Sequence, residues 1–247
     1  MDQRVLPMNA RLWTRIGGAA AIGGGALGLV FNAIHPQVDD LEDTLAQVQL
    51  VADSDIWVLD HLSLMFGVLL ITVFVTALDR TITTPTAMPW VRLAYTMQIV
   101  AAGTMVVLIG LDGIASKLIF EEWATATGNE REILTQIVTA IEEIDIAIFT
   151  TFITVQYGIV YTLVGLAMWL SDDHPNSLGI PTLLLGALAT AAGITLTFVG
   201  LNADTALPGF GTILTILLWT IPIGIWMLLN TPEPARNSPA EPVTANM

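Results

Sequence analysis

The chain has no cysteine and only eight basic residues, of which a single one, Lys117, is lysine. The absence of cysteine excludes disulfides, thiolate metal sites and a cysteine nucleophile. The shortage of basic residues argues against nucleic acid as a partner. Charged residues make up only 12% of the chain and hydrophobic residues 54%, above the roughly 45–50% of a soluble domain. This composition, with a mean hydropathy of +0.71, excludes a soluble globule and predicts a polytopic membrane protein.

Acidic residues far outnumber basic ones, with 22 against 8 and a formal net charge of −14. An acidic, lysine-poor balance is typical of proteins from salt-loving archaea, in which carboxylates keep exposed surfaces hydrated. The alternative is a set of acidic loops with no relation to salt. We favour the halophilic interpretation.

Six apolar segments are long enough to cross a bilayer, which takes roughly 20 helical residues. They lie at about 12–34, 57–78, 90–119, 144–170, 178–201 and 210–229. The sequence therefore predicts an all-α, six-helix membrane domain over residues 1–230, multi-pass in the cell membrane. The proline-rich, polar tail at 231–247 is predicted to be disordered and cytoplasmic.

The positions of arginine and lysine predict the orientation, because short loops rich in them stay cytoplasmic. Six arginines fall on the side of the two termini: Arg4, Arg11, Arg15, Arg80, Arg92 and Arg236. Only Lys117 and Arg131 fall on the other side. We therefore expect both termini to be cytoplasmic and the acidic loops to face outward.

Two outer segments are longer than turns. The segment 35–56 is acidic, and Asp53 or Asp55 is a plausible N-cap for the second span. In the segment 120–143, helical spacing begins at Leu134 and continues into the fourth span, which predicts one helix projecting past the outer membrane face. Neither segment is long enough for a domain.

Small residues recur at four-residue spacing as Ala20-Gly24-Gly28 in the first span and Ala189-Gly193 in the fifth. Such spacing lets helix backbones approach closely in lipid. We expect these residues to pack within one bundle, although a contact between two copies of the chain would use the same pattern.

Ionisable residues within spans are the best functional signal in a membrane protein, because a charge inside the bilayer is costly. Asp60 and Glu142 lie in first helical turns, where the positive helix end stabilises an acid. Asp112 lies near the end of its span, where an anion is disfavoured, and Asp145 continues an apolar stripe. We therefore predict that Asp112, Asp145, Asp60 and Glu142 line an outward-facing polar cavity that binds a proton or a cation.

His35 and His61 form a second candidate site with Asp60. Two imidazoles and a carboxylate can hold a divalent metal and leave a position for water. Nevertheless, no HExxH or comparable fixed spacing supports the site, and a hydrogen-bonded polar cluster is the simpler interpretation. The same two histidines would serve a transmembrane haem only if His35 reached inward.

Other enzymatic chemistries lack their motifs. The chain has no GxxxxGK[ST] phosphate loop and no GxSxG nucleophile elbow. The three glycines at 23–25 lie inside an apolar span, where they serve packing. An enzyme is therefore the less favoured class.

The order of features along the chain resembles that of uncharacterised six-span membrane proteins of bacteria and archaea. The shared layout is a glycine-rich first span, an acidic loop ending near Trp57, the Asp60-His61 span, a third span led by Arg92 and a long outer helix. The resemblance covers most of the chain but rests on layout, so it implies an architecture and no site residues.

Three functions remain open at this point. The first is a small transporter or a membrane subunit with an acidic outer cavity, and the second is a membrane-embedded metal-dependent enzyme. The third is a structural or assembly partner of another membrane protein. Apart from the lipid bilayer, the expected partners are another protein or a second copy of the chain, and a divalent metal is the cofactor that the candidate site would take.

Overall fold

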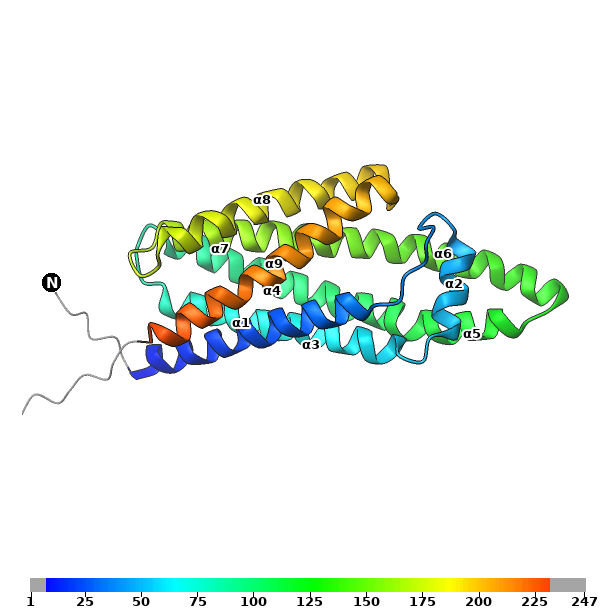
Figure 1. Cartoon of the computed structure of the whole chain (residues 1–247), viewed down its shortest axis with the longest axis horizontal. Coiled ribbons are helices and arrows are strands. Elements are labelled where there is room, and N and C mark those ends of the chain that lie inside the picture. Colours follow the sequence, from blue (N-terminus) through cyan, green and yellow to red (C-terminus); the bar gives the residue numbers. More distant parts are fainter. Residues whose placement is uncertain (1–7, 232–247) are drawn as a thin grey trace, which may run out of the picture.

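The computed structural model describes residues 8–231, and this part of the chain is helical without strands (Figure 1). Two π-helical segments, η1 and η2, join α4 to α5 and α6 to α7 into continuous helices. The elements are α1 (Met8–Ile34), α2 (Thr44–Asp53), α3 (Trp57–Thr81), α4 (Met88–Leu108), η1 (Ile109–Ser116), α5 (Lys117–Thr125), α6 (Gly128–Ile153), η2 (Thr154–Ile159), α7 (Val160–Trp169), α8 (Asn176–Val199) and α9 (Ala203–Leu229).

Six of these helices are long and apolar enough to span a membrane, which confirms the predicted fold class. The main difference from the sequence prediction concerns the third and fourth helices. They are 38 and 42 residues long, and they turn back at Gly128, whose φ is +59°. The predicted continuous helix from Leu134 into the fourth span is therefore present as part of α6. The tail from residue 232 onward lies outside the described residues.

One predicted helix cap is wrong. The residue that caps α3 is Ile56, which makes no side-chain capping bond, so neither Asp53 nor Asp55 caps this helix. The Asp53 carboxylate instead accepts a hydrogen bond from Gln49 within α2, a helix that the sequence pattern did not indicate.

Helix α1 packs between α3 and α9, and its glycines allow its backbone to approach both helices closely. A Cβ atom on Gly24 would lie 2.9 Å from the carbonyl oxygen of Gly67 in α3. A Cβ on Gly25 would lie 2.8 Å from the carbonyl oxygen of Leu217 in α9. Side chains larger than hydrogen would force these backbones apart, so the small residues of α1 pack inside the bundle.

Both ends of the described chain lie at the same end of the bundle, where α1 begins and α9 ends (Figure 1). At the opposite end, α5 and the first half of α6 extend beyond α8 and α9, and α2 lies across them (Figure 1). A small separate apolar core holds this end together and consists of Val48, Val51, Trp57, Phe120, Trp123 and Val138. The candidate site lies beside this core, because Trp57 belongs to both.

Candidate functional site

His61 is held at both ring nitrogens. Its Nδ1 lies 2.8 Å from the backbone carbonyl oxygen of Trp57, one turn earlier in α3. Its Nε2 lies 2.8 Å from Oδ2 of Asp112 in η1. The indole N–H of Trp57 donates to the backbone carbonyl of Asp112 at 2.9 Å. These three contacts fix the His61 ring, which is 3% exposed, between α3 and η1.

His35, one residue past the end of α1, contacts Asp60 of α3. The distance from its Nδ1 to Oδ2 of Asp60 is 2.7 Å, and the same carboxylate oxygen lies 3.8 Å from Nδ1 of His61. Asp60 is 1% exposed, and its second oxygen, Oδ1, is buried without a hydrogen-bond partner. A buried carboxylate oxygen without a partner is costly, so this one is available to a ligand.

The aromatic rings at this site pack against one another. The ring centroids of His35, Trp57 and His61 lie 4.4–5.1 Å apart. Such mutual packing restricts the rotation of both imidazoles and so preorganises their nitrogens.

Among the described residues, His35, Asp60 and His61 form a group that could hold a metal ion, since one ligand atom from each lies within 4.8 Å of the others. We call these three residues the triad. Imidazole nitrogen with carboxylate oxygen is the donor set of zinc and related divalent transition metals. The His61–Asp112 contact matches the usual support of such a site, in which a ligating histidine donates its other ring N–H to a carboxylate.

The π-helical turn of η1 is what brings Asp112 to the triad. A π-helix adds a residue to a helical turn and thereby redirects the side chains around it. Gly113 permits the contact, since a Cβ there would lie 2.7 Å from the Cβ of His61. Glycine spacing in the sequence gives no hint of this turn.

Glu142 and Asp145 of α6 lie within electrostatic range of Asp112, so the sequence-predicted acids do gather at one end of the bundle. Oδ1 of Asp145 is buried without a hydrogen-bond partner. By contrast Glu143 is exposed, and Asn202 caps α9 through the backbone N–H groups of Asp204 and Thr205. The predicted outward-facing cavity at these acids stays a prediction.

A second polar cluster, which the sequence did not single out, lies deeper in the bundle. Gln98 of α4 and Gln156 of η2 exchange two amide hydrogen bonds of 2.8 and 3.1 Å, and Gln98 also donates to Thr72 of α3 at 3.0 Å. Both glutamine residues are fully buried. Their amides satisfy each other and tie three helices together.

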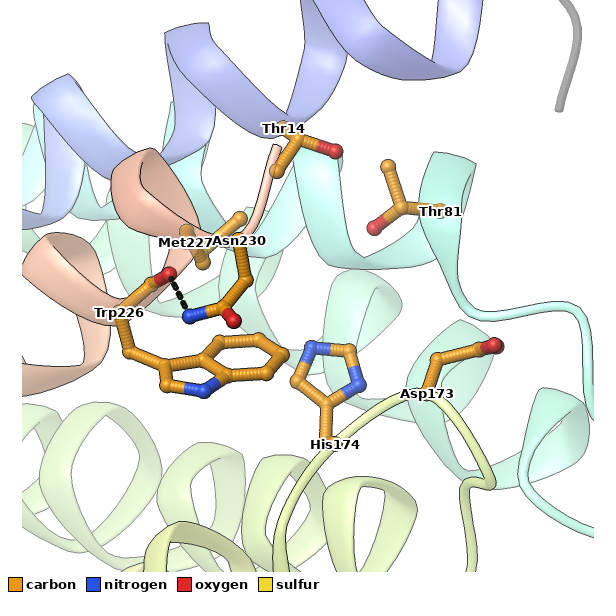
Figure 2. Close-up of a pocket in the computed structure, with 7 residues that line it drawn as sticks. All are labelled: Thr14, Thr81, Asp173, His174, Trp226, Met227 and Asn230. Atoms are coloured by element: carbon orange, nitrogen blue, oxygen red, sulfur yellow. Dashed lines mark hydrogen bonds between the residues drawn. The ribbon is translucent and has the colours of Figure 1, made fainter. Parts of the chain in front are cut away.

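A cavity of about 140 Å³ lies at the opposite end of the bundle from the triad, where α1 begins and α9 ends (Figure 2). His174, from the loop before α8, packs its ring on Trp226 of α9 at 5.0 Å between centroids. Burial lowers the pKa of His174 to about 4, which keeps this imidazole neutral at physiological pH. His174 lies far along the bundle from the triad and takes no part in it.

Comparison of the chain with protein-family models, with curated proteins and with solved structures finds no match.

Proposed function

We propose that this protein is an integral membrane protein that holds one divalent transition-metal ion in the triad and uses it for chemistry at one face of the membrane. The observation that carries the proposal is the triad itself, with two imidazoles and a buried carboxylate whose ligand atoms lie within 4.8 Å. The partnerless Oδ1 of Asp60 supports it, because an ion could coordinate a buried oxygen that no hydrogen bond satisfies.

The nitrogens of His61 have distinct roles in this proposal. Nε2 faces the Asp112 carboxylate, so it is the nitrogen that would keep its proton when an ion is bound. Nδ1 then remains for the ion, and it lies 3.8 Å from the Asp60 oxygen. Binding would displace the proton that Nδ1 donates to the Trp57 carbonyl, so metal uptake would release a proton.

An ion with three protein ligands keeps an open position, at which it polarises a water or a substrate oxygen. Asp112 would orient His61, while Glu142 and Asp145 supply nearby carboxylates that can accept a proton. The core residues Val68 and Leu108, which lie inward of the triad along α3 and α4, are apolar and buried. Their packing favours a resident ion over one that passes through the bundle.

We further propose that the termini are cytoplasmic and that the triad lies at the outer face of the cell membrane. Arg11, Arg15, Arg80 and Arg92 belong to the end of the bundle where the termini lie, while Lys117 and Arg131 belong to the other. A chain without cysteine allows a direct test by single cysteines. Glu122→Cys in intact cells should react with a membrane-impermeant maleimide, and Asp172→Cys should react only after lysis.

Metal content tests the main proposal. Protein purified in detergent without chelator should contain about one Zn²⁺-class ion per chain, or take it up after metal removal. Asp60→Ala and His61→Ala should lose the ion, whereas His174→Ala, a histidine change at the other end, should keep it. Folded, metal-free protein that takes up none of Zn²⁺, Co²⁺ and Mn²⁺ would contradict the proposal.

Cation transport is a second candidate, and the partnerless Oδ1 of Asp145 favours it. In this case the triad would load an ion that moves on to the acids of α6. Protein in liposomes with a trapped metal-sensitive dye should then show Zn²⁺ entry, and Asp145→Asn should slow entry while leaving ion binding intact. Binding without entry would leave the resident ion as the better account.

A further inference from the structure

An open groove of about 520 Å³ runs between α4 and α6 on the surface of the membrane-spanning bundle. Its lining is small and largely apolar, and includes Gly103 and Val107 of α4 and Ile144, Ile148 and Thr151 of α6. Gly103 and Val107 are exposed, so the groove opens sideways toward the lipid. The acyl chain of an amphiphile is the kind of ligand that fits such a lining.

One end of the groove leads to the acidic residues. Val107 precedes Asp112 by five residues, about one turn along the helix where α4 passes into π-helical η1. Ile148 follows Asp145 by three residues, so these two side chains share one face of α6. Neither acid lines the groove itself, but both lie within about one helical turn of its lining, so the polar end of a molecule in the groove would extend toward them.

Glu142 and Asp145, two of the acids near this end of the groove, have no basic side chain as an ion-pair partner in the described part of the chain. Within the part of the chain that the structure describes, no ion pair joins Glu142 or Asp145 to a basic side chain, and Asp112 pairs only with His61. Oδ1 of Asp145 is buried without a partner. An uncompensated carboxyl at the membrane boundary favours a cation beside it.

We propose that the groove between α4 and α6 binds an amphiphile with an apolar chain and a cationic, amine-type head group, with the chain along Gly103 and Ile148 and the head toward Asp112 and Asp145. This inference goes beyond the proposed function and does not require the metal ion. If both hold, the amphiphile is the class of substrate that the metal site would act on.

Two of the three glycines of the third membrane-spanning helix, Gly103 and Gly110, provide a matched pair of variants. A Cβ added at Gly103 or at Gly110 meets nothing within 4 Å, so a larger residue is tolerated at either position. Only Gly103 lines the groove. Gly103→Leu therefore fills the groove, and Gly110→Leu adds the same side chain to the same helix elsewhere.

The experiment uses the full chain in lipid nanodiscs and two spin-labelled probes with identical acyl chains, one with a trimethylammonium head and one with a sulfate head. Electron paramagnetic resonance measures how much of each probe is immobilised by the protein. We expect the trimethylammonium probe to bind roughly tenfold more tightly than the sulfate probe. Gly103→Leu should abolish immobilisation of both, Gly110→Leu should not, and Asp145→Asn should remove the head-group preference alone.

Three results would overturn the inference. Equal immobilisation of the two probes by the wild-type protein would show that the acids do not select the head group. Loss in Gly110→Leu equal to that in Gly103→Leu would show that the groove is not the site. Immobilisation of neither probe above the level of boundary lipid would show that no such site exists. Treatment of the wild-type protein with a chelator should leave probe binding unchanged, so failure of the metal proposal is recognised separately.

Discussion

Two of the polar clusters between the membrane-spanning helices lie beside π-helical segments. At η1, Asp112 reaches His61 and the triad; at η2, Gln156 reaches Gln98. The glutamine pair is neutral, and each amide satisfies the other through two hydrogen bonds. The triad is ionisable and leaves a buried oxygen of Asp60 without a partner.

The difference teaches how to separate a polar group that stabilises a bundle from one that serves a ligand. Both π-helical turns bring a polar side chain to a neighbouring helix, so the turn alone does not distinguish them. What distinguishes them is whether the donors and acceptors match. A matched pair stabilises the native packing, whereas an unmatched buried carboxylate costs stability and persists where function requires it.

The largest expected effect comes from removing the carboxylate of the triad. Asp60→Leu should weaken Zn²⁺ binding by more than about a hundredfold, because it removes the only charged ligand. The same change should lower the melting temperature of the metal-free protein only slightly, because the lost contact with part-buried His35 is offset by the removal of a buried oxygen without a partner. Competition with a chelating dye and thermal unfolding in detergent measure the two effects. A metal-free variant that melts well below the metal-free wild type would show that Asp60 is structural.

The next effect concerns the support of the triad. Asp112→Asn keeps the shape of the side chain but removes the carboxylate that accepts from Nε2 of His61. Zn²⁺ affinity should fall by about ten- to a hundredfold, as is typical for the second partner of a ligating histidine. Glu143→Gln, which alters an exposed acid on α6, is the control and should bind normally. Equal losses in both variants would point to general electrostatics instead of a specific contact.

Substitutions in the glutamine pair should lower the stability of the protein without affecting metal binding, the opposite of the effect expected at the triad. Gln98→Leu leaves the amide of Gln156 buried without its partner and should destabilise the protein by about 1–2 kcal/mol. Combining it with Gln156→Leu should recover much of that loss, because no unmatched amide remains. Thermal unfolding of the two single variants and the double variant gives the coupling energy. Additive losses would mean that the two amides do not act as a pair.

Much of the fold follows from local sequence, because each bilayer crossing requires its own apolar run and six such runs are visible. The candidate metal residues were also predictable, since His35, Asp60 and His61 lie near span ends where ionisable groups are conspicuous. These three residues come together because α1 ends beside α3. The small residues of α1, which are visible in the sequence, allow that close packing.

The remaining features depend on relations between distant segments. Trp57 holds Asp112 through its indole N–H and His61 through its backbone carbonyl, two contacts that the local sequence does not indicate. Gln98 and Gln156 pair across 58 positions, and their contact follows from the register of α4 against η2, which no local pattern specifies. The cap predicted at Asp53 or Asp55 is wrong because Asp53 is the last residue of α2 and Ile56 takes the N-cap position of α3.

The smallest effect is the pH dependence of stability that comes from His174, at the opposite end of the bundle from the triad. It distinguishes an imidazole that burial keeps neutral from the ionisable residues of the triad. Burial lowers the pKa of His174 to about 4, whereas an unfolded histidine titrates near 6.5. Between these values the unfolded chain takes up a proton that the folded chain refuses, so stability falls as the pH drops below 6.5 and is unaffected above it. At pH 5.5 the loss should be about 1 kcal/mol, or a few degrees in the melting temperature.

His174→Gln should reduce the difference in melting temperature between pH 7.5 and pH 5.5. A chelator should not change that difference, because no residue of the triad is involved. An unchanged difference in the variant would place the acid sensitivity elsewhere, with the triad as the next region to test.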